Sequence, residues 1–346
     1  MRQVPEAVNV GVIGLGVGSG HAATYMRCRS ARLLAICDIS KEWLEHCRQA
    51  WKVPKAYTDY RELLADEEID AVSVCVPNHL HCPISVAALE AGKHVLCEKP
   101  PAVNAAEVER MIAAARKADR TLMFSFNQRF TAEAQFLKRY IEEGRLGEIY
   151  FARTCWLRPM GMLPAPVMDR PTGPYNRNWF NERAKGGGAM RDLGSHVIDR
   201  ALWFMGFPGI AKVHGNAYCK FGPAFVAGKG VTFDADDHSI GYVQFADGAA
   251  MSVEASFGSF VEKETIVTEL YGDKGGAVLG EGVRVFDSAG GGFVTSSLTR
   301  YGEPVENAQE HFVRSILNGA TPIILPEQGL AVMQVIDGIY GGAGWA

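Results

Sequence analysis

The chain has 346 residues, of which 47% are hydrophobic and 21% charged, values near the averages of soluble globular proteins. This length favours two domains over a single hydrophobic core. The formal net charge is −4 and no basic block occurs, which argues against nucleic-acid binding. No apolar run approaches the roughly 20 residues that span a bilayer, and the first residues lack the hydrophobic stretch of a signal peptide, so we expect no membrane association.

Eight cysteines are spread along the chain, and six of them lie in the first hundred residues within apolar segments. None forms a C-x-x-C pair, and the cysteines and histidines do not cluster at the tight spacing of a zinc site. We therefore expect buried, reduced thiols in a cytoplasmic protein that binds no metal.

The first part of the chain alternates short apolar runs with helical segments. The sequence predicts strands at 8–13, 32–37, 71–76, 94–97 and 121–125. It predicts helices at 21–29, 40–50, 60–64, 83–91 and 104–118. This alternation is typical of a doubly wound parallel sheet, and we assign residues 1–126 to an α/β Rossmann domain that binds a dinucleotide.

The pattern changes after about residue 126. A helix at 132–143 and a strand-like run at 147–156 precede a loop at 157–188, which is rich in Pro, Gly, Asn and Arg. Loops of that length inside a compact protein are usually functional or mobile. Further along, the sequence predicts a helix at 189–205, strands at 212–220, 238–245, 249–257 and 265–271, and a hairpin turn at 246–248. Residues 127–346 are expected to form an α+β domain with a large, mostly antiparallel open sheet, which binds substrate and mediates oligomerisation.

A glycine-rich turn, Gly14-Leu15-Gly16-Val17-Gly18-Ser19-Gly20, separates the first predicted strand from the first helix. Glycines there let the backbone approach a pyrophosphate, which the helix N-terminus attracts. The usual G-x-G-x-x-G pattern would place its third glycine at Ser19, so we expect a turn that is one residue longer. A plain strand-to-helix turn is the alternative, but Asp38 favours a dinucleotide because it ends the second strand, where an acceptor for the ribose 2′-hydroxyl belongs. A carboxylate repels a 2′-phosphate, so NAD is favoured over NADP, although the nearby Lys41 leaves NADP open.

Three side chains are candidates for holding or moving a proton. Lys99 ends the fourth predicted strand, and ligands collect at the carboxyl ends of parallel strands. Asp192 and His196 lie four residues apart on one face of the predicted helix, just after the glycines at 186–188. Taken singly, each has a structural reading: a surface lysine, a carboxylate at a helix N-terminus and a half-buried histidine.

Oxidation of an alcohol needs a group that takes the hydroxyl proton as hydride leaves the carbon. The imidazole of His196 titrates in the right range, and Asp192 could orient it or share its proton. The ammonium of Lys99 would stabilise a developing alkoxide, or a buried lysine with a lowered pKa could itself be the base.

The chain resembles the glucose–fructose oxidoreductase, inositol dehydrogenase and rhizopine-catabolism (Gfo/Idh/MocA) oxidoreductases. The resemblance runs through the whole chain, and its most specific parts are the Glu-Lys-Pro at 98–100 and the Asp-x-Gly-x-His at 192–196. The other parts that carry it are the residues at 14–20, 76–81, 91–97, 126–130, 186–206, 245–248 and 322–329.

This resemblance implies a Rossmann domain followed by an open-sheet domain whose exposed face pairs subunits, hence a homodimer or homotetramer. It implies that Lys99, Asp192 and His196 are catalytic. The implied cofactor contacts are Gly14, Leu15, Gly16, Val17, Asp38, Pro77, Asn78, His81, Glu98 and Lys99. His81 could equally be a packing residue, and Ser19 departs from the pattern at the phosphate turn.

The expected activity is hydride transfer between NAD and a carbinol or ketone of a sugar, cyclitol or related polyol, an NAD(P)-dependent dehydrogenase acting on CH–OH groups. Candidate substrate contacts are Arg158, Asp169, Arg177, Asn178 and Trp179, and Tyr175 or Trp156 could stack on a sugar ring. Each could also be an ordinary loop or interface residue. Two other functions stay open: a glycosidase that uses tightly held NAD for transient oxidation, and a catalytically silent sensor that binds a dinucleotide.

Overall fold

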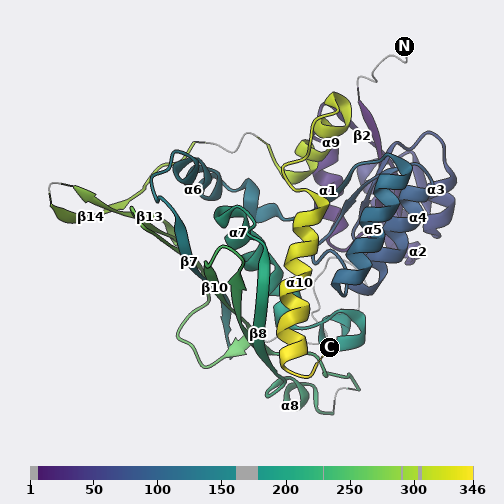
Figure 1. The fold of residues 1–346 in the computed structure, drawn as a ribbon. Coiled ribbons are helices and arrows are strands. Elements are labelled where there is room, and N and C mark those ends of the chain that lie inside the picture. Colours follow the sequence, from purple (N-terminus) through teal and green to yellow (C-terminus); the bar gives the residue numbers. More distant parts are fainter. Residues whose placement is uncertain (1–6, 161–177, 229, 290, 303–305, 346) are drawn as a thin grey trace. The chain divides into compact units, whose positions relative to one another are not determined.

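The structure, a computed structural model, describes residues 7–160, 178–228, 230–289, 291–302 and 306–345 (Figure 1). The described residues form two compact units. The first contains residues 7–126 and 306–330, and the second contains the remaining described residues from 127 to 302 and from 331 onward. In the described ranges, no helix is long and apolar enough to cross a membrane.

The first unit contains a six-stranded sheet in the order β3-β2-β1-β4-β5-β6, and every neighbouring pair is parallel. Its strands are β1 (Val8–Ile13), β2 (Ala31–Cys37), β3 (Lys55–Tyr57), β4 (Ala71–Val74), β5 (His94–Cys97) and β6 (Leu122–Phe124). The α/β Rossmann prediction is therefore confirmed. Strand β3 was not predicted, because three half-buried residues at a sheet edge are too few to show a hydrophobic period. Lys99 consequently follows the fifth strand of the chain, not the fourth.

The helices of this unit are α1 (Gly18–Tyr25), α2 (Lys41–Trp51), α3 (Tyr60–Ala65), α4 (His81–Glu90), α5 (Ala105–Ala118) and α9 (Ala308–Asn318), with the 3-10 turn η1 (Asn78–Leu80). Side-chain oxygens of Ser40, Asp59 and Asn104 cap α2, α3 and α5, which fixes where these helices begin. Helix α9 was not predicted. It has a capping box formed by Asn307 and Glu310, and it packs against α1, β1 and β5.

The second unit contains an eight-stranded sheet in the order β14-β13-β12-β11-β7-β10-β9-β8, in which only the β7–β10 pair is parallel. Its strands are β7 (Ile149–Pro159), β8 (Ile210–Tyr218), β9 (His238–Phe245), β10 (Ala250–Ser259), β11 (Thr265–Gly272), β12 (Gly276–Gly280), β13 (Gly282–Ala289) and β14 (Gly292–Ser297). The predicted large, mostly antiparallel sheet is confirmed. Strands β12 to β14 were not predicted, because glycines interrupt this part of the sequence and hide its alternation.

The helices of the second unit are α6 (Ala132–Glu142), α7 (Ser195–Met205) and α8 (Gly222–Val226), with the 3-10 turns η2 (Asn127–Phe130), η4 (Asn178–Asn181) and η5 (Arg183–Lys185). Helix α10 (Pro326–Gly342) was not predicted, and the boundary between the units falls within it, after Leu330.

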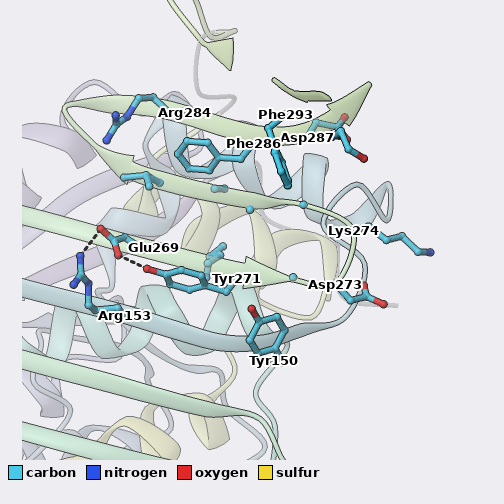
Figure 2. A pocket seen from close by; sticks show the side chains of 17 residues that line it. Tyr150, Arg153, Glu269, Tyr271, Asp273, Lys274, Arg284, Phe286, Asp287 and Phe293 are labelled. Atoms are coloured by element: carbon cyan, nitrogen blue, oxygen red, sulfur yellow. Dashed lines mark hydrogen bonds and ion pairs between the residues drawn. The ribbon is translucent and has the colours of Figure 1, made fainter. Parts of the chain in front are cut away.

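The two faces of the second sheet differ in character. Helix α7 packs on β7 and β11. There, Arg200 Nε donates to Thr268 Oγ1 at 2.9 Å, and the Thr268 hydroxyl bonds that of Thr154 at 2.7 Å. Successive residues of a strand point to opposite faces. Arg153 and Glu269 therefore lie on the outer face, where Arg153 Nη2 donates to Glu269 at 2.8 Å beside Tyr271 (Figure 2).

A buried ion pair joins η2 to α7. Arg129 donates to both carboxylate oxygens of Asp199, at 2.9 Å from Nε and 2.5 Å from Nη2. Both side chains are 0% exposed, and the guanidinium lies over the rings of Trp203 and Phe207. The pair fixes helix α7 to the segment that starts the second unit.

Candidate active site

The first position of the glycine turn after β1 has a backbone conformation and surroundings that only glycine fits. Gly14 has φ +88°, and a Cβ there would collide with the carbonyl oxygen of Cys75. The next residue, Leu15, donates its N–H to Asp38 Oδ2 at 2.8 Å, and Ser40 N donates to the other oxygen at 2.9 Å. Asp38 is 4% exposed, so its carboxylate is fixed beside the turn, at the carboxyl ends of β1 and β2.

Helix α1 begins at Gly18, which corrects two predictions: a helix from His21 to Arg29 and a turn one residue longer than usual. A Cβ on Gly18 would lie 2.8 Å from Val12 Cγ1, whereas one on Gly20 would meet nothing within 4 Å. Gly18 therefore allows the close helix–strand packing that the third glycine of the usual pattern provides. The helix N-terminus directly follows Gly16 and Val17, as pyrophosphate binding requires.

The segment after β4 places Asn78 and His81 in the interior, each 1% exposed. The ring nitrogens of His81 lie 2.8 Å from the Pro100 carbonyl oxygen and 2.9 Å from that of Val76. Burial lowers the pKa of His81, and the hydrogen bonds to these two carbonyls oppose that effect. His81 thus braces the segment after β5 against Val76 and Pro77.

Glu98 and Lys99 follow β5, and Glu98 is paired with His21, a residue that the sequence did not single out. His21 Nε2 lies 2.9 Å from Glu98 Oε1, and Glu98 Oε2 accepts the backbone N–H of Lys99 at 3.2 Å. Burial alone would raise the pKa of Glu98, but the hydrogen bond and charge of His21, with Lys99 and Ser125, hold that pKa at about 2. Because 77 residues separate His21 from Glu98, the pairing has no local sequence signal.

In the second unit, Asp192 and His196 lie at a change of helix type. The single helix predicted from Ala189 to Met205 is instead a π-helical turn, η6 (Met190–Gly194), followed by α7. Asp192 lies in the wider π turn and is half-buried, and His196 lies in the first turn of α7 with 8% exposure. π turns inside helices are rare and frequent at functional sites. The predicted simple i, i+4 spacing on an α-helix is therefore wrong in detail.

The carboxylate of Asp236 accepts hydrogen bonds at the start of this helix, and the sequence analysis did not identify this residue. The carboxylate accepts Met190 N at 2.9 Å, Ser239 Oγ at 2.8 Å and Tyr340 Oη at 2.7 Å. Burial raises the pKa of Asp236, and its three donors act in the opposite direction. Gly188 (φ +114°) precedes the helix, and a Cβ there would collide with Asp236. The only sequence signal was an acidic run at 234–237, which alone indicates no such role.

An aromatic and charged cluster lies beside His196 on the α7 face of the sheet. The rings of Trp156 and His196 have centroids 5.4 Å apart. Glu264 Oε1 accepts from Trp156 Nε1 at 2.8 Å and from Arg158 Nε at 3.1 Å, and Arg158 lies over the Trp156 ring. The structure thus groups Arg158 and Trp156 with His196, and adds Glu264, which the sequence did not indicate.

The other predicted substrate residues lie in or next to the 157–188 segment. Asp169, Tyr175 and Arg177 lie outside the described residues, and Asn178 begins η4. Trp179 stacks on Phe180 with ring centroids 3.6 Å apart. The backbone carbonyls of Trp179 and Phe180 lie so close to Gly187 that a Cβ there would collide with both.

A hollow of about 610 Å³ lies elsewhere, on the outer face of the same sheet (Figure 2). Strands β7 and β11 to β14 line it, and Arg153, Glu269 and Tyr271 point into it. None of the predicted catalytic, cofactor or substrate residues lines it. Since Trp156 and His196 are on the α7 face, this hollow is separate from the candidate site.

Comparison with known proteins assigns the two parts of the chain. Residues 8–126 match the model of an oxidoreductase family with an NAD-binding Rossmann fold, and residues 134–278 match the GFO/IDH/MocA C-terminal domain. The levoglucosan dehydrogenase of Pseudarthrobacter phenanthrenivorans is 31% identical over 295 residues, which cover 79% of this chain and 73% of that protein. The chain belongs to the GFO/IDH/MocA oxidoreductase family.

Two other comparisons match this chain along nearly its whole length. The D-glucoside 3-dehydrogenase of Escherichia coli K12 is 28% identical over 346 residues, covering 97% of this chain and 95% of that protein. A solved structure of levoglucosan dehydrogenase in complex with NADH superposes with a TM-score of 0.84 and 26% identity, covering 98% and 97% of the two chains. The predicted family, oxidoreductase class and NAD cofactor are confirmed.

The arrangement of the first unit fits a dinucleotide. The positive φ of Gly14, the close packing at Gly18 and the N-terminus of α1 provide the turn that a pyrophosphate needs. Asp38 supplies a carboxylate at the end of β2. The residues present thus suit NAD.

Proposed function

We propose that this NAD-dependent oxidoreductase interconverts a secondary hydroxyl and a ketone on a sugar, cyclitol or related polyol. One observation carries the proposal: the chain matches D-glucoside 3-dehydrogenase along almost its whole length. Its lysine, aspartate and histidine at Lys99, Asp192 and His196 supply groups that can move a proton. The placement of His196 beside Trp156 supports it, since an imidazole next to an aromatic face suits a sugar carbinol.

Bound NAD would accept or return the hydride. The hydroxyl proton must leave in the same step, and we assign its transfer to Lys99, Asp192 and His196. His196 or Lys99 takes the proton from the hydroxyl oxygen, and Asp192 orients the acceptor. In the reverse direction the same groups return the proton to the ketone oxygen.

We assign cofactor binding to the carboxyl edge of the six-stranded sheet. Gly14, Leu15, Gly16 and Val17 would contact the pyrophosphate, and Asp38 the ribose hydroxyls, which favours NAD over NADP. Pro77, Asn78, His81, Glu98 and Lys99 would line the nicotinamide side. His81 and Glu98 would act there chiefly through the segment they brace, because each already bonds protein groups.

We assign substrate binding to the cluster beside His196. Trp156 would stack on the sugar ring, and Arg158, held by Glu264, would donate to its hydroxyls. Arg177, Asn178 and Trp179 remain further proposed contacts. A site that bonds several hydroxyls discriminates strongly, because a missing hydroxyl leaves a buried polar group unpaired.

We also propose that the protein is a cytoplasmic homodimer or homotetramer that associates through the outer face of the eight-stranded sheet. That face exposes Tyr218, Ile240, Tyr242 and Tyr271, each about two-fifths accessible. All eight cysteines are free thiols, which suits a reducing compartment. Light scattering of the purified protein tests the assembly.

The test of the function is a screen of NAD reduction across inositols, aldoses, glucosides and anhydrosugars. Lys99→Ala and His196→Ala should each lower kcat on the best substrate about 100-fold or more, with NADH binding largely kept. Lys117→Ala, an exposed lysine on α5, is the control and should keep normal turnover. Near-normal turnover in both site variants would refute the assigned roles.

The same screen separates the two other functions. Release of a sugar from a glycoside without net NADH formation would indicate a glycosidase that uses NAD transiently. NAD binding without turnover of any polyol would indicate a sensor.

A further inference from the structure

A line of four hydrogen-bonded polar side chains crosses the interior of the first unit. Tyr25 Oη lies 2.8 Å from Ser73 Oγ, which lies 3.1 Å from His21 Nδ1, and His21 Nε2 lies 2.9 Å from Glu98 Oε1. Tyr25 and Ser73 are 0% exposed and His21 is 4% exposed. The line starts in α1 and β4 and ends at the residue before Lys99.

The carboxylate sets the direction of donation at its end of this line. Glu98 can only accept, so His21 Nε2 carries a proton and donates a hydrogen bond to Glu98. At the other end, burial raises the pKa of Tyr25 far above its usual value, so Tyr25 keeps its proton beside Ser73. The ring of His21 is thus bonded through both nitrogens, to Ser73 and to Glu98.

The carboxylate at the end of the line touches Lys99. Its second oxygen accepts the Lys99 backbone N–H at 3.2 Å, and its charge attracts the Lys99 side chain. From the other side, His81 lies 2.8 Å from the carbonyl oxygen of Pro100. Two buried histidines therefore bond the Glu98–Pro100 segment: His21 bonds the side chain of Glu98, and His81 bonds the backbone carbonyl of Pro100.

Burying four polar side chains costs free energy unless all of them are hydrogen-bonded. Apolar side chains in the same positions would stabilise the fold equally well. The line has one feature that an apolar core lacks: it ends in a fixed anion next to Lys99. We propose that His21 is a positioning residue, which through Glu98 holds Lys99 in the orientation needed for proton transfer. The catalytic part of this inference rests on the proposed function, whereas the structural part does not.

Three substitutions of His21 separate positioning from packing. Glutamine can place its Nε2 donor where the imidazole Nε2 lies, so His21→Gln keeps the bond to Glu98. Asparagine reaches only as far as Nδ1, so His21→Asn keeps the bond to Ser73 and loses Glu98. His21→Leu loses both. His94→Leu is the matched control, since His94 starts β5 at the opposite end of the strand from Glu98.

We expect His21→Leu and His21→Asn to lower kcat about tenfold or more, because small misplacements of a reacting group have large effects on rate. KM for NAD should stay within about twofold, and His21→Gln should recover most of the rate. Amide hydrogen exchange at Lys99, measured without substrate, should accelerate in the Leu and Asn variants but not in His21→Gln or His94→Leu.

Equal rates in His21→Gln and His21→Asn, or unchanged exchange at Lys99 in both His21→Asn and His21→Leu, would overturn the inference. If His21→Leu does not fold, the Asn–Gln comparison decides alone. Should the wild type oxidise no polyol, the proposed function fails, yet the exchange comparison still supports or refutes the hold of His21 on Lys99.

Discussion

Asp236 accepts the backbone N–H of Met190 at 2.9 Å, and so a carboxylate from the loop before β9 caps the helix that carries Asp192 and His196. The same carboxylate accepts the hydroxyl of Tyr340, in the C-terminal helix α10. Helix α10 is thereby connected, through one buried anion, to the start of the helix that carries Asp192 and His196.

This connection predicts an order of stabilities. Tyr340→Phe removes one of three donors to a buried carboxylate and should lower the free energy of unfolding by about 1–3 kcal/mol. Asp236→Ala leaves three buried donors without their acceptor, so it should cost more and also lower kcat. Tyr60→Phe, at a partly exposed tyrosine that begins α3, should change stability by less than about 0.5 kcal/mol. Urea unfolding checks the order, and equal effects of Tyr340→Phe and Tyr60→Phe would contradict it.

Different substitutions separate the observed role of Asp38 in the turn from its proposed role at the ribose. Asp38→Ala should weaken discrimination against NADP, but it also removes the acceptor of the Leu15 and Ser40 N–H groups and should destabilise the turn. Asp38→Asn keeps an acceptor oxygen and removes only the charge that repels a 2′-phosphate. We expect the Asn variant to shift the NADP/NAD ratio of kcat/KM toward NADP with the smaller loss of stability. An unchanged ratio in both variants would place the ribose contact elsewhere.

The cluster beside His196 predicts a change in substrate charge preference. Glu264 pairs with Arg158, whose side chain is 25% exposed, and so offsets its charge. Glu264→Gln should leave stability within about 1 kcal/mol, because partly exposed ion pairs contribute little. It should improve kcat/KM for an aldonate or uronate relative to the neutral sugar by about threefold or more, since Arg158 then attracts a carboxylate. An unchanged ratio would mean that Arg158 does not face the substrate.

Trp156 tests the stacking role in the same cluster. Trp156→Ala should raise KM for the polyol about tenfold while NADH binding stays normal, because stacked rings contribute about 0.5–1.5 kcal/mol beyond the area they bury. Trp156→Phe keeps an aromatic face and should change KM less. A KM for the polyol that is the same in both variants and the wild type would exclude stacking.

Glu98 predicts an acid-sensitive contribution to stability. Its pKa is about 2 in the folded protein and about 4.3 in an unfolded chain, so its ionised form stabilises the fold by about 3 kcal/mol. This contribution is complete above about pH 5 and is lost as the pH falls toward 2. The stability difference between wild type and Glu98→Gln should therefore shrink between pH 7 and pH 3. The exposed Glu109→Gln serves as a control, and a difference independent of pH would contradict the pairing with His21.

Most strands and helices of the first unit could be predicted from the sequence, because its strands are buried on both faces and appear as continuous apolar runs. Strand β5 begins and ends where predicted, and α2 and α5 begin at capping residues that the sequence displays. Strand β3 and the strands after residue 275 were missed because short or glycine-rich strands carry little periodicity. Helices α9 and α10 were missed as well, although α9 carries the signature of a capping box.

Candidate site residues could be predicted from the sequence where they lie in motifs. They could not be predicted where they act through partners that are distant in the sequence. Lys99 and Asp38 follow strand ends, a position with a general chemical meaning. His21, Asp236 and Glu264 have their roles only through residues far along the chain or across a sheet. Met190, the first residue of the π turn, donates its backbone N–H to Asp236, a partner 46 positions away in the sequence that no local propensity encodes.

The ion pair between Arg129 and Asp199 limits how this fold can change over evolutionary time. Losing either partner alone strands an uncompensated charge in a region with no access to water, at a cost of about 3–5 kcal/mol. Replacing both with apolar residues of similar volume can be tolerated. The two positions are therefore expected to vary jointly among homologous chains, because a substitution at only one of them gives a destabilised protein.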